Sequence, residues 1–144
     1  MTHRQRFTQI ANYFETLTPA SVGQIKDLYA PTARFKDPFN EVKGIADIER
    51  IFQHMYVALE QPRFVIVEEI VDGQQAFLTW EFRFKFKRFD TQTEQVVLGT
   101  THLVLDDQGQ ISLHRDYWDA AEELYEKLPV VGALMRWLKR RANS

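Results

Sequence analysis

The sequence predicts an α+β fold in which helices come first and a mostly antiparallel sheet follows. Apolar residues recur at helical spacing in the first part of the chain, and from Arg63 onward they alternate with polar residues, as they do in strands. The chain has 144 residues, which is enough for one core without disulfides, and it contains no cysteine. We therefore predict a single domain over residues 1–144.

Two helices are predicted at the start of the chain. The first runs from Arg4 to Leu17, with Phe7, Ile10, Ala11 and Phe14 on one face, and Thr18-Pro19 interrupts it. Ser21 is expected to cap a second, short helix, which Pro31 should end, because a proline denies helical backbone angles to the residue before it.

A short strand over residues 33–37 and a third helix are predicted next. Asp37-Pro38 stops the strand, and residues 39–41 form a turn. The third helix follows Gly44, is closed by Pro62, and carries an apolar stripe of Ile45, Ile48, Ile51, Phe52, Met55 and Leu59.

Four antiparallel strands are predicted to form a meander. They cover about 63–71, 75–89, 95–105 and 110–118, with turns at Asp72-Gly73 and at residues 106–109. The second of them has one charged face and one apolar face, the latter made by Leu78, Trp80, Phe82, Phe84 and Phe86.

Residues 120–144 are predicted to form a C-terminal helical extension that breaks at Pro129. Its end is basic, with Arg136, Lys139, Arg140 and Arg141. Such an end is either a solvated helix terminus favoured by the helix dipole or a weak contact with an anionic membrane surface.

Composition limits the partners and the compartment. A net charge of −2 and a pI near 6.1 argue against nucleic-acid binding, which relies on clustered Lys and Arg. The four histidines show no metal-ligand spacing, so we expect no metal, and no motif indicates a cofactor. The N-terminus lacks an apolar leader, no run of 18 apolar residues occurs, and the absence of cysteine suits a reducing compartment, so we expect a cytoplasmic protein.

The element order resembles that of the nuclear transport factor 2-like superfamily, which includes ketosteroid isomerases and SnoaL-like polyketide cyclases. Two helices, a short strand ending in Asp37-Pro38, a third helix and a curled meander carry this resemblance over residues 5–119. It implies a cone-shaped domain whose helices and sheet enclose a pocket.

The resemblance also implies site residues. Tyr13 and Asp37 are similar to the oxyanion-hole tyrosine and the general base of ketosteroid isomerases, but Thr101 stands where those enzymes have a second, acidic donor. The segment 114–119 resembles the last strand of SnoaL-like cyclases, in which Asp116 matches the acid/base aspartate.

Strand alternation groups the candidate residues on one side of the sheet. Thr101 and Leu103 share a face of their strand, and His114, Asp116 and Trp118 share a face of theirs. The resemblance makes this face the pocket lining, which is mostly apolar with few polar groups, as is usual for small-molecule sites. We expect a small hydrophobic ligand there, contacted also by Phe14, Leu17, Phe52, Met55, Trp80, Phe82 and Phe84.

Each candidate also has a structural interpretation. Asp37 could merely end a strand and start a turn, and Asp116 could form an ion pair with Arg34 or with Arg115 of a neighbouring chain. His114 could be a satisfied interior or dimer-face histidine, and the aromatic run from Trp80 to Phe86 is core packing unless the core is incompletely filled.

Two functions therefore remain open from the sequence. The first is a cofactor-independent isomerase, cyclase or hydratase that uses Asp37, Asp116, His114 and Tyr13 for proton transfer. The second is a non-catalytic module that binds a ligand or another protein. For either function we expect a homodimer formed through the opposite sheet face, where Val96, Leu98 and Val104 lie.

Overall fold

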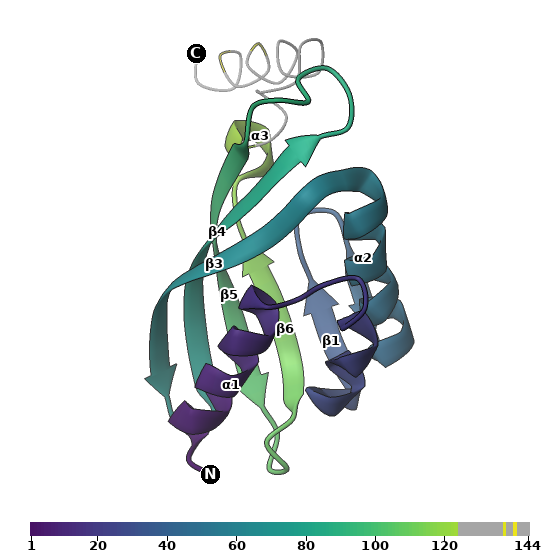
Figure 1. Cartoon of the computed structure of the whole chain (residues 1–144). Coiled ribbons are helices and arrows are strands. Elements are labelled where there is room, and N and C mark those ends of the chain that lie inside the picture. Colours follow the sequence, from purple (N-terminus) through teal and green to yellow (C-terminus); the bar gives the residue numbers. More distant parts are fainter. Residues whose placement is uncertain (124–136, 138–139, 141–144) are drawn as a thin grey trace.

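The computed structural model describes residues 1–123, 137 and 140, and the structural statements below concern these residues. They form a strongly curved six-stranded sheet with helices packed against it (Figure 1). The elements are α1 (His3–Glu15), the 3₁₀ helix η1 (Val22–Asp27), β1 (Tyr29–Lys36), β2 (Glu41–Lys43), α2 (Ile45–Ala58), β3 (Leu59–Asp72), β4 (Gln75–Phe86), β5 (Gln95–Leu105), β6 (Ile111–Tyr117) and α3 (Ala120–Glu123).

The sheet is mixed and open, with the strand order β2-β1-β6-β5-β4-β3. The predicted meander of β3 to β6 is antiparallel throughout, and β1 joins it by pairing in parallel with β6. This parallel pairing places Phe35 opposite His114 and Lys36 opposite Arg115. The segment after β1 therefore comes to lie beside the end of β6, although the two are about eighty residues apart in sequence.

The two predicted boundaries that relied on Pro31 and Pro62 are wrong. The second helix ends at Asp27, and Pro31 lies inside β1, where the pairing with β6 is irregular between Tyr29 and Arg34. Pro62 lies inside β3 rather than closing α2, and the register with β4 shifts between Glu60 and Arg63. A proline cannot donate to a ladder, so a strand accepts it at a bulge.

Three smaller differences from the predicted elements also appear. Residues 41–43 form the edge strand β2 rather than the end of a turn, and β4 ends at Phe86 rather than 89. Ser21 stands at the N-cap of η1, but its hydroxyl accepts a hydrogen bond from the Thr18 backbone instead of capping the helix. The predicted tail helices fall mostly outside the described residues, which include only the short α3 of that extension.

Helix α1 covers the inner face of the sheet at the end where β3 meets β4, and α2 packs against β1 and β3 (Figure 1). A capping box closes the start of α1, because Thr2 accepts from the Gln5 backbone while the Gln5 side chain accepts from the Thr2 backbone. The core joins both helices to the sheet, and its fully buried large side chains are Tyr29, Phe7, Ile10, Ile25, Ile48, Leu78, Leu103 and Ile111.

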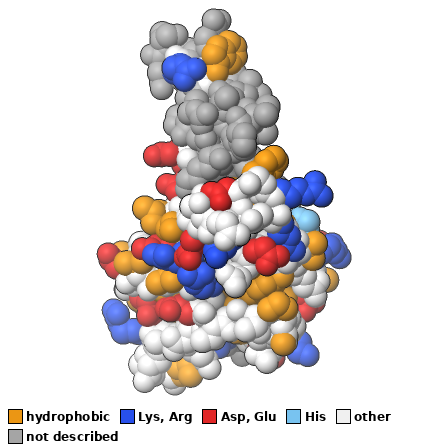
Figure 2. Space-filling model, turned by 45° about the horizontal axis from the view of Figure 1, so that its top comes forward, with side chains coloured by type: hydrophobic (Ala, Val, Ile, Leu, Met, Phe, Trp, Pro, Cys, Tyr) orange, Lys and Arg blue, Asp and Glu red, His pale blue; other side chains and the backbone are white. Residues whose placement is uncertain are grey.

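The outer surface mixes charged and apolar side chains, and Figure 2 shows small hydrophobic patches set among acidic and basic groups on one face. Several large apolar side chains of the sheet's outer face are exposed, among them Leu98 at 58% and Phe77 at 41%. No helix in the described part of the chain is long and apolar enough to cross a membrane.

Candidate functional site

A largely apolar cavity of about 270 Å³ lies between α2 and the inner face of the sheet. Eight of its seventeen lining residues are Phe or Trp. Its polar lining consists of Asp37, Asn40, His54 and Asp116. The strands supply Trp80, Phe82, Phe84 and Asp116, while Phe52 and Met55 come from α2. The volume equals about nine water molecules at the roughly 30 Å³ that a water occupies in the liquid.

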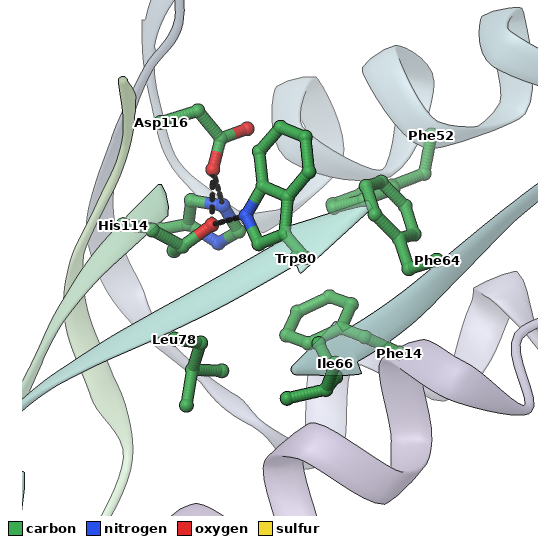
Figure 3. Close-up of a pocket in the computed structure, with 9 residues that line it drawn as sticks. Phe14, Phe52, Phe64, Ile66, Leu78, Trp80, His114 and Asp116 are labelled. Carbon is green, nitrogen blue, oxygen red and sulfur yellow. Dashed lines mark hydrogen bonds and ion pairs between the residues drawn. The ribbon is translucent and has the colours of Figure 1, made fainter. Parts of the chain in front are cut away.

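A second, much smaller void of about 20 Å³ adjoins the same group of side chains deeper in the fold. Phe52, Phe64, Trp80 and Asp116 line both spaces. Figure 3 shows Asp116 and His114 on one side of this void, with Trp80, Phe64 and Phe14 around it. It has room for about one water molecule.

Asp116 stands at the centre of a hydrogen-bonded chain. Its Oδ1 accepts from the Thr101 hydroxyl at 2.6 Å and from His114 Nε2 at 2.9 Å (Figure 3). Thr101 in turn accepts from the Trp80 indole Nε1 at 2.8 Å. The strand register explains this convergence, since Thr101 pairs directly with Asp116 and Leu103 with His114. Among the described residues, both of these hydrogen bonds go to Oδ1, and the second carboxylate oxygen, Oδ2, takes no part in them.

His114 is held by partners at both ring nitrogens. Its Nδ1 lies 2.6 Å from the hydroxyl of Tyr29, and both residues are buried, at 4% and 0% exposure. When Nε2 carries the proton that it donates to Asp116, Nδ1 accepts from the Tyr29 hydroxyl. Every N–H and O–H group of this hydrogen-bond network then has an acceptor. Burial raises the pKa of Tyr29 well above its ordinary value of 10.0, and the charge of Asp116 raises it further, so Tyr29 stays a neutral donor.

Aromatic rings surround the imidazole. Phe35 lies 4.6 Å from it between ring centroids, Phe14 meets it edge-on at 5.7 Å, and Tyr29 is nearly parallel at 5.9 Å. This packing fixes the orientation of the ring that holds Asp116. Burial agrees with the interpretation of His114 as an interior histidine, and His114 also lines the small void beside Asp116.

The absence of a side chain at Gly99 leaves room for the Trp80 indole, which donates to Thr101. The two residues are direct partners on β5 and β4, and a Cβ at Gly99 would lie 2.2, 2.6 and 2.7 Å from three atoms of the six-membered indole ring. Real Cβ atoms essentially never come so close. The indole therefore lies flat over the bare backbone of β5, within reach of the Thr101 hydroxyl.

Asp37 lines the cavity but is also committed to a turn. Its Oδ1 accepts from the backbone N–H groups of Phe39 and Asn40, at 2.8 and 2.6 Å, and both carboxylate oxygens lie 3.1 Å from the Asn40 side-chain nitrogen. The pairing of Lys36 with Arg115, continued by one residue, sets Asp37 beside Asp116. Asp37 therefore lies at the cavity and also starts a turn, which are the two positions that the sequence suggested for it.

Tyr13 lies apart from the two carboxylates. Its hydroxyl donates to the backbone carbonyl of Ser21 at 2.8 Å, and it lines neither space described above. Burial, followed by the nearby Tyr56, Glu49 and Asp27, raises the pKa of Tyr13 to about 12. The structure therefore does not bring Tyr13 together with Asp37 and Asp116, because the α1–η1 connection takes up its hydroxyl.

The other predicted lining residues divide between the cavity, the small void and the core. Phe52, Met55, Trp80, Phe82, Phe84 and Trp118 line the cavity, and Phe14 and Thr101 line the void. Leu17 and Leu103 belong to the buried core.

Sequence reasoning missed several residues of the site. The predicted helix before Pro31 includes Tyr29, which hides its place beside His114, and the predicted strand at about 63–71 does not by itself indicate that Phe64 pairs with Phe82. The sequence pattern does not indicate that His54, Phe39 and Asn40 line the cavity, because their position depends on how β1 and α2 pack together. Among residues 1–123, 137 and 140, no group of three or more His, Asp or Glu could hold a metal ion.

Comparisons with known proteins place the chain in a family. The family model for the SnoaL-like domain matches residues 10–114. No curated protein matches the sequence.

Similar solved structures share the fold at low sequence identity. A protein of ketosteroid isomerase-like fold from Catenulispora acidiphila, in complex with trimethylamine, has a TM-score of 0.70 and 17% identity, over 86% of this chain and 92% of that one. A Jannaschia protein classed with SnoaL-like polyketide cyclases has a TM-score of 0.69 and 16% identity, over 83% and 88% of the two chains. An M. tuberculosis epoxide hydrolase of the LEH-like type has a TM-score of 0.68 and 13% identity, over 98% of both.

The curved sheet and the covering helices agree with the fold of these neighbours, and the family model spans most of the described fold. The chain belongs to the SnoaL-like domain family and has the nuclear transport factor 2-like fold.

Proposed function

We propose that the protein is an acid–base enzyme that needs no cofactor and moves a proton on a small hydrophobic molecule bound in the 270 Å³ cavity. The observation that supports the proposal is the pattern of hydrogen bonds to the Asp116 carboxylate. His114 and Thr101 both donate to Oδ1, which orients the group and leaves Oδ2 for a ligand. A base must be held within hydrogen-bond reach of the proton it takes, and rigid neighbours provide that.

The proposed step is redox-neutral. Asp116 Oδ2 takes a proton from a carbon next to a carbonyl, and the electron pair of the broken C–H bond moves to the carbonyl oxygen as an enolate. Return of the proton to a different carbon gives an isomer. Attack of the enolate carbon on a second carbonyl closes a ring, and the alkoxide that forms takes the proton back from Asp116. Among the lining side chains with N–H groups, Asn40 is bonded to Asp37 and Trp80 to Thr101, so His54 and Trp118 are the ones that we assign to the enolate oxygen.

Several features of the cavity suit this chemistry. Apolar walls exclude water, which strengthens the hydrogen bonds of the reacting groups. The names of structural neighbours include an isomerase, polyketide cyclases and an epoxide hydrolase, and each of these reactions begins or ends with a proton transfer.

The proposal is tested by incubating the protein with a panel of hydrophobic ketones, diketones and epoxides and by following the products by chromatography and mass spectrometry. For any compound that is turned over, Asp116→Asn should reduce kcat by at least about a hundredfold, the low end of what a general base contributes. Asp107→Asn, which changes an exposed carboxylate of the β5–β6 turn, is the matched control and should keep full activity. Full turnover by Asp116→Asn would contradict the proposal.

A non-catalytic binding module is the second candidate. It is favoured by the engagement of Asp37, whose two oxygens both have partners within its own turn, so that one of the two predicted carboxylates is not free for chemistry. Under this alternative, ligands bind in the cavity, and no compound of the panel is consumed.

A further inference from the structure

The charge of the cavity lining points to the chemical class of the ligand. Two carboxylates, Asp37 and Asp116, line the space, and none of its described lining residues is Lys or Arg. The other polar lining groups are His54 and Asn40. An anionic ligand would meet two negative charges with no lysine or arginine to offset them.

The basic residues nearest in sequence to the two aspartates are directed elsewhere. Lys36 and Arg115 alternate onto the outer face of the sheet, where Lys36 pairs with Glu41 at 3.8 Å and Arg115 lies 4.7 Å over the ring of Tyr117. They line an outer groove with Arg34 and Lys43, and also a small surface space that Asp37 and Asp116 line from the other side, but they do not line the cavity. On the cavity side, the two carboxylates therefore face no lysine or arginine of the described lining.

The rest of the lining is aromatic, which also suits a cation. A ring attracts positive charge to its face, and an ammonium group enclosed by several rings is a recognised use of this attraction. Phe39 and Trp118 meet edge-to-face at 5.5 Å next to Asp37, with Phe39 49% exposed to solvent. Trp80 and Phe84 are buried at the inner end. One carboxylate and two rings thus stand near the mouth, and Asp116 stands further in.

We infer that the ligand of this cavity is a hydrophobic amine, bound as its ammonium ion, with the charged nitrogen held by Asp37, Asp116 and the surrounding aromatic rings. This inference rests on the proposed function only in that the amine is the substrate of the same site. Asp37, although it is held by its turn, supplies the negative charge near the mouth, and Asp116 faces the carbon that lies between the nitrogen and the carbonyl group of the substrate. The aromatic walls contact the apolar part of the molecule.

Equilibrium binding tests this without any knowledge of the reaction. The probes are phenyltrimethylammonium, its neutral isostere tert-butylbenzene, and the anion 4-tert-butylbenzoate, and binding is followed by calorimetry and by quenching of tryptophan fluorescence. We expect the cation to bind at least about tenfold more tightly than the neutral isostere, as a desolvated cation–π contact and a carboxylate together provide. The anion should bind most weakly.

Two variants assign the preference to the carboxylates. Asp37→Asn and Asp116→Asn keep an oxygen acceptor for the donors that each side chain serves, so both should fold, and circular dichroism checks that they do. Each should weaken the cation several-fold and leave the neutral isostere unchanged, whereas Asp107→Asn should alter neither. If the native protein binds the neutral isostere as tightly as the cation or more tightly, the inference is wrong. It is also wrong if each of the two single variants still prefers the cation as strongly as the native protein does.

The outcomes separate this inference from the proposed function. If the cation binds selectively but Asp116→Asn turns over a substrate as fast as the native protein, the ligand class stands and the proton-transfer proposal fails. If a neutral ketone is turned over in an Asp116-dependent way while the cation shows no preference, the proposal stands and the ligand class is wrong.

Discussion

Replacing Gly99 by alanine tests how the site is built, because the added methyl group would occupy the place of the Trp80 indole. The new Cβ would lie 2.2 Å from one indole atom and within 2.7 Å of two more, whereas ordinary contact begins at 3.4 Å. The ring must therefore move by about 1 Å, which stretches its 2.8 Å bond to Thr101 beyond hydrogen-bonding distance.

The energetic cost follows from these distances. Forcing an extra methyl into a packed core costs about 1–3 kcal/mol, and leaving a buried N–H donor without its acceptor costs about 1–3 kcal/mol more. We expect Gly99→Ala to lower the free energy of unfolding by about 2–6 kcal/mol. Without the clash, alanine would stabilise a strand interior by about 0.5–1 kcal/mol relative to glycine, so even the sign of the effect is diagnostic.

Urea unfolding followed by circular dichroism measures the change, and a double-mutant cycle identifies its cause. In a Trp80→Phe background the atoms that the Cβ would strike are absent, so the cost of Gly99→Ala should fall below about 1 kcal/mol. A change of less than about 0.5 kcal/mol in the native background would refute the reasoning. An equal cost in both backgrounds would also refute it.

Three further predictions concern the groups around the site. Thr101→Val removes the acceptor of the Trp80 indole and a donor to the Asp116 carboxylate, and it should lower the free energy of unfolding, measured in urea, by about 1–3 kcal/mol. Because the pKa values of Tyr13 and Tyr29 are raised in the folded protein, the unfolded chain loses these protons first, near pH 10. The free energy of unfolding should therefore be intact below pH 10 and fall from there to about pH 12, and a flat urea-unfolding profile over that range would contradict this. Asp37→Ala should cost about 1 kcal/mol in thermal or urea unfolding, because two backbone N–H groups lose their acceptor, whereas Asp37→Asn should cost less since it keeps an oxygen there.

Alternation along the strands made the centre of the site predictable. Once residues 101–103 and 114–118 are recognised as neighbouring strands, parity places Thr101, His114 and Asp116 on one face, and the structure has them hydrogen-bonded there. The same parity placed Trp80, Phe82 and Phe84 along one wall. These inferences needed only the period of two and the resemblance to a known fold.

Features set by the loops and by irregular strands could not be predicted in this way. Pro31 and Pro62 indicate chain breaks in sequence, but the structure accommodates both in irregular strand pairing, and Tyr29 reaches His114 only because β1 begins earlier than expected. Tyr13 lies one helical position from Phe14, which lines the small void, yet its hydroxyl meets the backbone at Ser21. The contact between Tyr13 and Ser21 depends on the path of the α1–η1 connection, which the periodicity of the sequence does not indicate.

The homodimer remains a prediction. The outer face of the sheet, where Leu98 and Phe77 are exposed, is the surface it would use. Sedimentation equilibrium over a range of concentrations tests it, and a monomer at every concentration would contradict it.

The central claim is that Asp116 takes a proton from the carbon of a bound molecule, and exchange of solvent deuterium measures that step even where no product accumulates. The native protein and Asp116→Asn are incubated in D₂O with 2-(dimethylamino)acetophenone and with the neutral 4-tert-butylacetophenone, and deuterium at the carbon beside the carbonyl is followed by NMR. We predict that the native protein accelerates exchange of at least one of the two ketones above the buffer rate and that Asp116→Asn does not. Exchange that is equally fast with both proteins, or no faster than in buffer although the ketone is bound in the cavity, would contradict the claim.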